Sequence, residues 1–111
     1  MVRFGLAMNG GRLLRPETVQ LLQASQRLPS GEETGYGLGW DLENVTVAGR
    51  PTQTVGEDGA VLGGTAVSIL TFRDPALVIA ALSNTSYADT AGIALKVAES
   101  FAQPTGASSR R

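Results

Sequence analysis

The chain has 111 residues, a formal net charge of −1, and neither cysteine nor histidine. This length allows one small domain with a single hydrophobic core. The composition excludes disulfides, thiolate chemistry, a Ser-His-Asp triad, the usual zinc ligands and a strongly basic nucleic-acid surface. We therefore expect no metal or cofactor, and neither nucleic acid nor a membrane as partner.

Two short helices are predicted at the N-terminal end. Residues 1–8 have an apolar face and stop at Asn9-Gly10-Gly11, a typical helix end. The same segment is too short an apolar run for a signal peptide. Pro16 suits the first position of a second helix, which we expect to reach about Ala24. Residues 25–35 are polar and contain Pro29 and Gly31, which predicts a loop.

Strands follow in the middle of the chain. Residues 36–40 read Tyr-Gly-Leu-Gly-Trp, which predicts a strand whose glycines allow close backbone approach, extended by residues 41–47. We expect a turn at residues 48–51 and a short strand at 52–55. Residues 56–65 contain four glycines and predict a turn. Residues 66–72 and 77–83 are strongly apolar and predict a hairpin closed by residues 73–76.

A last helix is predicted over residues 90–101. Asp89 is its expected N-cap, and its apolar positions fall on one stripe. Residues 104–111 are rich in Gly, Ser and Arg, so we expect a disordered tail. The predicted fold class is α+β, with an antiparallel sheet of about four strands, the C-terminal helix packed on one face, and two short N-terminal helices.

The order of these landmarks resembles the β-lactamase-related serine hydrolases, which include class C β-lactamases, D-alanyl-D-alanine carboxypeptidases, family VIII esterases and LACTB-like proteins. Arg3-Phe4-Gly5 and the following Asn9-Gly10-Gly11 are similar to a helix end of that family, and Tyr36-Gly-Leu-Gly-Trp40 to a recurrent strand. Leu82-Ser83-Asn84 matches the end of its last strand. The resemblance implies that residues 1–103 form the C-terminal part of such a domain, with the sheet as part of the family's antiparallel sheet.

Glu57-Asp58-Gly59-Ala60 stands where the family has a basic residue or histidine, then Ser or Thr, then Gly. The resemblance implies a substrate-binding role for these residues, with the Ala60 backbone N–H as an oxyanion-hole donor. The two acidic side chains would repel a substrate carboxylate, which favours neutral esters or amides over β-lactams. The competing interpretation of the same residues is a solvated turn between strands.

No catalytic residue can be named. The Ser-x-x-Lys motif of the family is absent, because Ile93 stands three places before the single lysine, Lys96. The Tyr-x-Asn motif of the family is absent as well. Asp41 and Glu43 are expected at surface positions of a strand, and Ser83 and Ser86 lack a base.

The sequence therefore favours a C-terminal piece of such a hydrolase, inactive alone, whose partner is the missing N-terminal part or a second copy. The alternative is a non-catalytic binding or interaction module derived from the same fold. The sequence does not indicate a cellular compartment. It contains no apolar run long enough to span a membrane.

Overall fold

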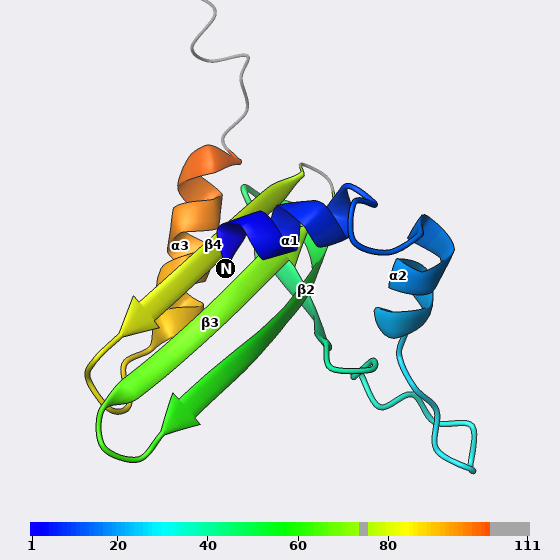
Figure 1. Ribbon diagram of the computed structural model, residues 1–111, viewed down its shortest axis with the longest axis horizontal. Helices are drawn as coiled ribbons and strands as arrows, with labels where there is room; N and C mark the ends of the chain where they lie inside the picture. The colour runs from blue at the N-terminus through cyan, green and yellow to red at the C-terminus, as the bar shows by residue number, and fades with distance from the viewer. Residues whose placement is uncertain (74–75, 103–111) are drawn as a thin grey trace, which may run out of the picture.

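A four-stranded antiparallel sheet forms the centre of the protein in the computed structural model, which describes residues 1–73 and 76–102. Its strands are β1 (Asp41–Val47), β2 (Arg50–Val61), β3 (Thr65–Phe72) and β4 (Leu77–Ser83), and they lie in chain order as a meander (Figure 1). The strands are joined by short connections, so each pairs with its neighbour in sequence. The prediction of an α+β fold with about four strands is confirmed.

Helices cover both faces of the sheet. The N-terminal helix α1 (Val2–Asn9) crosses one face, and α2 (Pro16–Leu22) lies beside it. The C-terminal helix α3 (Thr90–Phe101) packs behind the sheet in the view of Figure 1. The helix predicted from Pro16 ends two residues earlier than expected, at Leu22. The helix predicted at residues 90–101 has the predicted bounds, and its packing on one face of the sheet is confirmed.

The alternation of side chains along the strands divides the core into two clusters. Beneath α3 the buried side chains are Val47, Phe72, Ile79, Ala94 and Ala98. On the other face they are Met8, Val19, Trp40 and Val55, with Phe4 of α1 stacked on the Trp40 ring at a centroid distance of 6.2 Å. Small residues on α3 let the helix approach the sheet closely, while Trp40 fills the space under α1 and α2.

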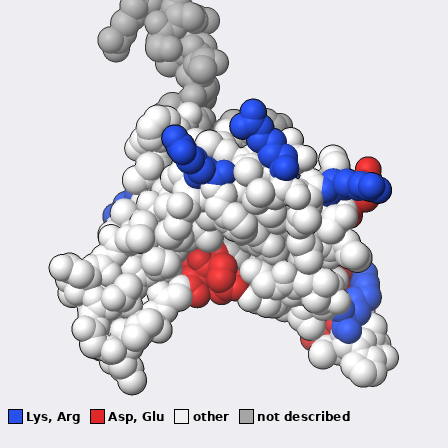
Figure 2. All heavy atoms as spheres, in the orientation of Figure 1, with Lys and Arg blue, Asp and Glu red and all other residues white. Residues whose placement is uncertain are grey.

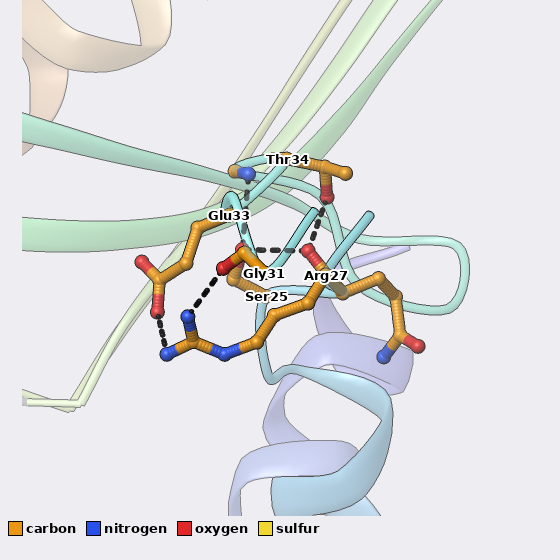
Figure 3. A network of polar contacts seen from close by, with 7 residues as sticks. Ser25, Arg27, Gly31, Glu33 and Thr34 are labelled. Carbon is orange, nitrogen blue, oxygen red and sulfur yellow. Dashed lines mark hydrogen bonds and ion pairs between the residues drawn. The ribbon is translucent and has the colours of Figure 1, made fainter. Parts of the chain in front are cut away.

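The polar segment that precedes β1 is folded by its own contacts. The Arg27 guanidinium donates to the Glu33 carboxylate at 2.8 Å and to the Gly31 carbonyl at 2.8 Å, and Thr34 Oγ1 donates to the Gln26 carbonyl at 2.9 Å (Figure 3). The ion pair is solvent-exposed and contributes little to stability. Together with the backbone hydrogen bond from Gln26 to the Tyr36 carbonyl, these contacts fix the path of the chain up to Tyr36.

Two predicted elements are wrong. Residues 36–40 are irregular rather than a strand, with only an isolated bridge between Tyr36 and Asp41, and Trp40 packs into the core. Close approach is still the role of Gly37, where a side chain would overlap the Leu22 carbonyl. Residues 56–61 are not a turn but the second half of β2, and the turn is confined to residues 62–64. Gly56 lies against the backbone of Ile69, so its glycine serves strand packing.

Some expectations fall outside the described residues. The predicted disordered tail at 104–111 and the Asp74-Pro75 part of the predicted turn belong to this group. Among the residues that the structure describes, no helix is both long and apolar enough to cross a membrane.

The Asp89 cap gives a direct test of the helix that supports the sheet. Asp89 Oδ1 accepts a hydrogen bond from the Gly92 backbone N–H at 3.0 Å. We expect Asp89→Ala to lower the free energy of unfolding by about 0.5–2 kcal/mol, because the N–H loses its acceptor. Asp89→Asn keeps an acceptor oxygen and is the matched control. Urea titration followed by circular dichroism measures both, and equal losses for the two variants would contradict the capping role.

Candidate functional site

The four residues singled out in the sequence lie together on β2, but they do not share a face. Cross-strand neighbours in an antiparallel pair point to the same side of the sheet. Asp58 and Ala60 stand opposite Ser68 and Ala66, on the α3 side, where Ser68 Oγ hydrogen-bonds Thr90 Oγ1 at 2.7 Å. Glu57 and Gly59 therefore point to the α1 side. The predicted acidic pair is divided between the two faces, as strand alternation requires.

The half of β2 that carries these residues has a free edge. The pairing of β1 with β2 ends at Asp41 and Gly56, whereas the pairing of β2 with β3 continues to Val61. Beyond Gly56, β2 thus has a hydrogen-bonding partner on one side only among the described strands. The free edge is defined here as the outer side of residues 57–61.

Antiparallel pairing decides which backbone groups point to this free edge, because alternate residues of a strand direct their N–H and C=O to opposite sides. The Leu42 N–H donates to the Gly35 carbonyl, away from β2, so the neighbouring Asp41 faces β2 at its partner Gly56. Counting on from Gly56 in steps of two, Asp58 and Ala60 direct their N–H groups outward. The Ala60 N–H is therefore a backbone donor at an exposed strand edge.

Glu57 occupies part of this edge with its own side chain. Its Oε1 accepts a hydrogen bond from the Asp58 N–H at 3.1 Å, which agrees with the outward direction of that group. Its Oε2 accepts a hydrogen bond from the Tyr36 hydroxyl. The Glu57 carboxylate thus joins Tyr36, the first residue of the irregular segment, to the free edge. The next outward donor is the Ala60 N–H, two residues further along the strand than the Asp58 N–H.

The hydrogen bond to Glu57 raises the pKa of Tyr36 above its ordinary value, with smaller contributions from desolvation and from the charges of Glu57 and Asp41. Ionisation of the phenol would remove the donated proton and place a negative charge beside a carboxylate, so the neutral form is favoured. At neutral pH, Tyr36 is a hydrogen-bond donor and not a base.

Acidic side chains surround this edge. Partial desolvation raises the pKa of Glu43. Its pKa is raised further by the charge of Asp41, by a hydrogen bond with Asp41 and by the charge of Asp58. Asp41, Glu43 and Asp58 line one cleft with the N-terminal turn of α3. Figure 2 shows acidic atoms in a hollow between the β2–β3 hairpin and the segment before β1. The local field at the free edge is therefore negative and unfavourable to anions.

Groups for nucleophilic catalysis are not assembled at this edge by the described residues. Ser83 Oγ accepts a hydrogen bond from the Thr85 N–H at 3.0 Å, and Ser68 Oγ is engaged with Thr90. Neither contact supplies a base. Within residues 1–73 and 76–102, no cluster of three or more acidic, histidine or cysteine side chains is arranged to hold a metal ion. The free edge presents outward backbone N–H donors and a negative electrostatic field. Both can affect the binding of a ligand, and neither requires a covalent step.

Tyr36 belongs to the site but was not predicted there. Of the two aromatic residues in the segment 36–40, Trp40 is buried and Tyr36 is 40% exposed. Tyr36 and Glu57 are 21 residues apart, and the bridge from Tyr36 to Asp41 and the pairing of Asp41 with Gly56 bring them together. No local sequence signal joins the two residues. Asp41 and Glu43 lie on a strand as expected, and the structure adds that they share the cleft with Asp58.

Comparison with known proteins gives one match. The family model described as Beta-lactamase matches residues 1–102. No curated protein and no solved structure matches the chain. The matched range includes the four strands and three helices of the described residues, and with them the free edge of β2.

The contact between Tyr36 and Glu57 predicts a measurable titration. In Tyr87→Phe protein, where Tyr36 is the only tyrosine, we expect the phenol to titrate above about 10, and Glu57→Gln to lower that value. Since the folded pKa is above the unfolded one, the stability contributed by the pair is present below the unfolded value and is lost as pH rises through the folded one. Absorbance at 295 nm follows the phenolate. An unchanged midpoint in Glu57→Gln protein would show that the contact does not form.

The direction of the backbone along β2 predicts different effects of proline at adjacent positions. Ala60→Pro removes an outward N–H and should change the free energy of unfolding by less than about 1 kcal/mol. Gly59→Pro removes an N–H directed at β3 and should cost about 1–3 kcal/mol. Thermal and urea unfolding of the two variants measure this contrast. A larger loss for Ala60→Pro than for Gly59→Pro would reverse the assignment of the free edge.

Proposed function

Because this chain belongs to the beta-lactamase family, we propose that it supplies the sheet-edge half of a serine-hydrolase active site whose nucleophile lies outside these residues. The observation that carries this proposal is the outward N–H of Ala60 on an edge of β2 that no other described strand covers. A backbone donor in that position is suited to hold a developing oxyanion during acyl transfer. The chain by itself contributes binding and polarisation, and is not expected to turn over substrate.

The substrate class follows from the charges at the edge. Glu57 replaces the basic or histidine residue that the family resemblance leads one to expect there, and Asp41, Glu43 and Asp58 lie nearby. A carboxylate on the substrate would meet like charges at short range, which disfavours its binding. We infer that the complete site acts on uncharged esters or amides rather than on carboxylate-bearing β-lactams.

One observation favours a second candidate function. The Glu57 carboxylate already accepts hydrogen bonds from Asp58 N–H and Tyr36 OH, so the edge has an internal ligand. In a non-catalytic interaction module such a contact would be a permanent structural link. In a hydrolase it would sit beside the substrate and exclude anions from it. The presence or absence of an upstream nucleophile distinguishes the two.

The first test is the reading frame directly upstream of Met1 together with acylation of the chain itself. We expect an in-frame Ser-x-x-Lys upstream, and no covalent adduct when the chain alone is incubated with a nitrophenyl ester or a penicillin and analysed by mass spectrometry. An upstream frame without the motif would favour the interaction module. A stoichiometric adduct on a serine of this chain would overturn the assignment of the nucleophile to another segment.

In the longer protein, Ala60→Pro should lower kcat for a neutral ester by about 10²–10³-fold with a small change in KM, because the lost donor acts on the transition state. Glu57→Lys is the companion variant. It retains the Ala60 N–H and should raise kcat/KM for a carboxylate-bearing substrate relative to a neutral one. Unchanged kcat in folded Ala60→Pro protein would exclude the oxyanion role.

A further inference from the structure

Three elements end around one pocket, at the opposite end of β3 from the free edge of β2. Helix α1 ends at Asn9, Gln23 directly follows the end of α2, and Arg73 directly follows the end of β3. These three residues line a pocket of about 350 Å³, defined here as the amide pocket. Ala60 pairs with residue 66 near the start of β3, six residues before its end, so the amide pocket lies roughly 20 Å from Ala60.

Two side-chain amides at this pocket have N–H groups without an acceptor. Asn9 Nδ2 and Gln23 Nε2 are both buried, and neither has a hydrogen-bond partner among the described residues. Gln23 as a whole is 5% exposed. Proteins rarely leave a buried donor unpaired, because its N–H groups lose their hydrogen bonds to water without replacement. Two such groups on one pocket indicate that it receives a hydrogen-bond acceptor.

Arg73 adds a positive charge to these donors. Its Nη2 donates to Gln23 Oε1 at 3.1 Å, which holds the amide oxygen toward the guanidinium and leaves Nε2 as the unpaired end of the same amide. Among residues 1–73 and 76–102, Arg73 has no carboxylate within ion-pair distance, and no aspartate or glutamate lines the amide pocket. Amide and guanidinium donors without a neighbouring acid favour an anion over a neutral acceptor such as water.

The surrounding surface has the same sign of charge. Residues 1–23 include Arg3, Arg12 and Arg15 but a single acidic residue, Glu17. Figure 2 shows basic side chains along the upper part of the molecule, over α1 and α2, with the acidic hollow below them. The field at this end of the molecule therefore attracts anions, whereas the field at the free edge of β2 repels them.

The other walls of the amide pocket are apolar. Met8, Val19 and Phe72 line it, and all three side chains are buried. A few convergent polar groups on an otherwise apolar wall are typical of pockets that bind small ligands, and a volume near 300 Å³ is at the lower end of their range. An anion with a short apolar stem would contact both kinds of wall at once.

We propose that the amide pocket binds a carboxylate group with a short apolar stem. The two oxygens of a carboxylate accept several hydrogen bonds together, so one group satisfies Asn9 Nδ2, Gln23 Nε2 and the Arg73 guanidinium. A single guanidinium balances a single negative charge. The carboxylate belongs to a free acid or to an acidic side chain of the segment that completes the hydrolase, and only the second source rests on the proposed function.

Nuclear magnetic resonance of the unmodified chain tests the recognition of charge. We expect hexanoate to shift the side-chain NH₂ signals of both Asn9 and Gln23, with a Kd on the order of 1 mM, as suits a ligand of this size. Hexanamide has the same stem without the charge, and it should bind roughly tenfold more weakly or worse. Equal affinity for the two compounds, or unshifted signals of these two amides, would overturn the proposal.

Substitutions separate the donor from the charge. Gln23→Met removes the unpaired donor at similar side-chain length and should raise the Kd for hexanoate roughly tenfold. Arg73→Gln changes an exposed residue, which keeps the fold, and should weaken hexanoate by a similar factor without affecting hexanamide. Gln26→Met is the matched control, since Gln26 is exposed and its Nε2 already donates to the Ala24 carbonyl. Equal effects of Gln23→Met and Gln26→Met, or an unchanged Kd in Arg73→Gln protein, would contradict the carboxylate site.

The longer protein identifies the source of the carboxylate. A free acid is the ligand if hexanoate binds the longer protein as it binds this chain. An upstream acidic side chain is the ligand if the Asn9 and Gln23 signals already lie at the hexanoate-bound positions and added hexanoate has no effect. Signals at the unbound positions together with no binding of hexanoate would refute both. Neither probe can acylate a serine, so these results are independent of the tests of Ala60 and of the upstream nucleophile.

Discussion

The unequal length of β1 and β2 is the constraint on which the rest of the structure depends. The pairing of β1 with β2 ends at Gly56, and β2 continues for five more residues that, among the described strands, pair with β3 alone. Because hydrogen-bonding groups alternate along a strand, this continuation necessarily turns a row of backbone donors toward open space. The position of Ala60, the contact of Glu57 with Asp58, and the reach of Tyr36 to Glu57 all follow from that geometry.

An exposed strand edge is usually either covered by a partner or protected by charged residues against pairing with other strands. The two edges of this sheet differ in this respect. At the free edge of β2, the Glu57 carboxylate takes one donor and the surrounding acids repel other strands and anions. At β4 there is neither a carboxylate nor any other charge on the strand.

The acidic field also shapes the chemistry open to the site. A carboxyl group with a raised pKa, as at Glu43, signals that charge is already crowded there. Adding a substrate carboxylate would increase that crowding, whereas a neutral acyl group brings no charge of its own before reaction. Under the proposed function, Glu57 in place of a basic residue would change which ligands the site accepts, without altering the fold. Backbone donation is independent of side-chain identity, which is why the edge persists through such a change.

The sequence by itself determined the fold class, the last helix with its Asp89 cap, the apolar hairpin and the family resemblance, because these depend on local periodicity, capping and ordered motifs. It placed Ala60 inside the glycine-rich residues 56–65, where it predicted a turn and the structure has the second half of β2. Tertiary structure decided the remainder. From the sequence alone, Gly56 and Gly59 predict a turn, but in the structure both pair with β3 as part of strand β2. Likewise, Tyr36 meets Glu57 only because Tyr36 bridges to Asp41 and Asp41 pairs with Gly56 of β2. Glu57 and Asp58 separate onto opposite faces only because residues 56–61 form a strand.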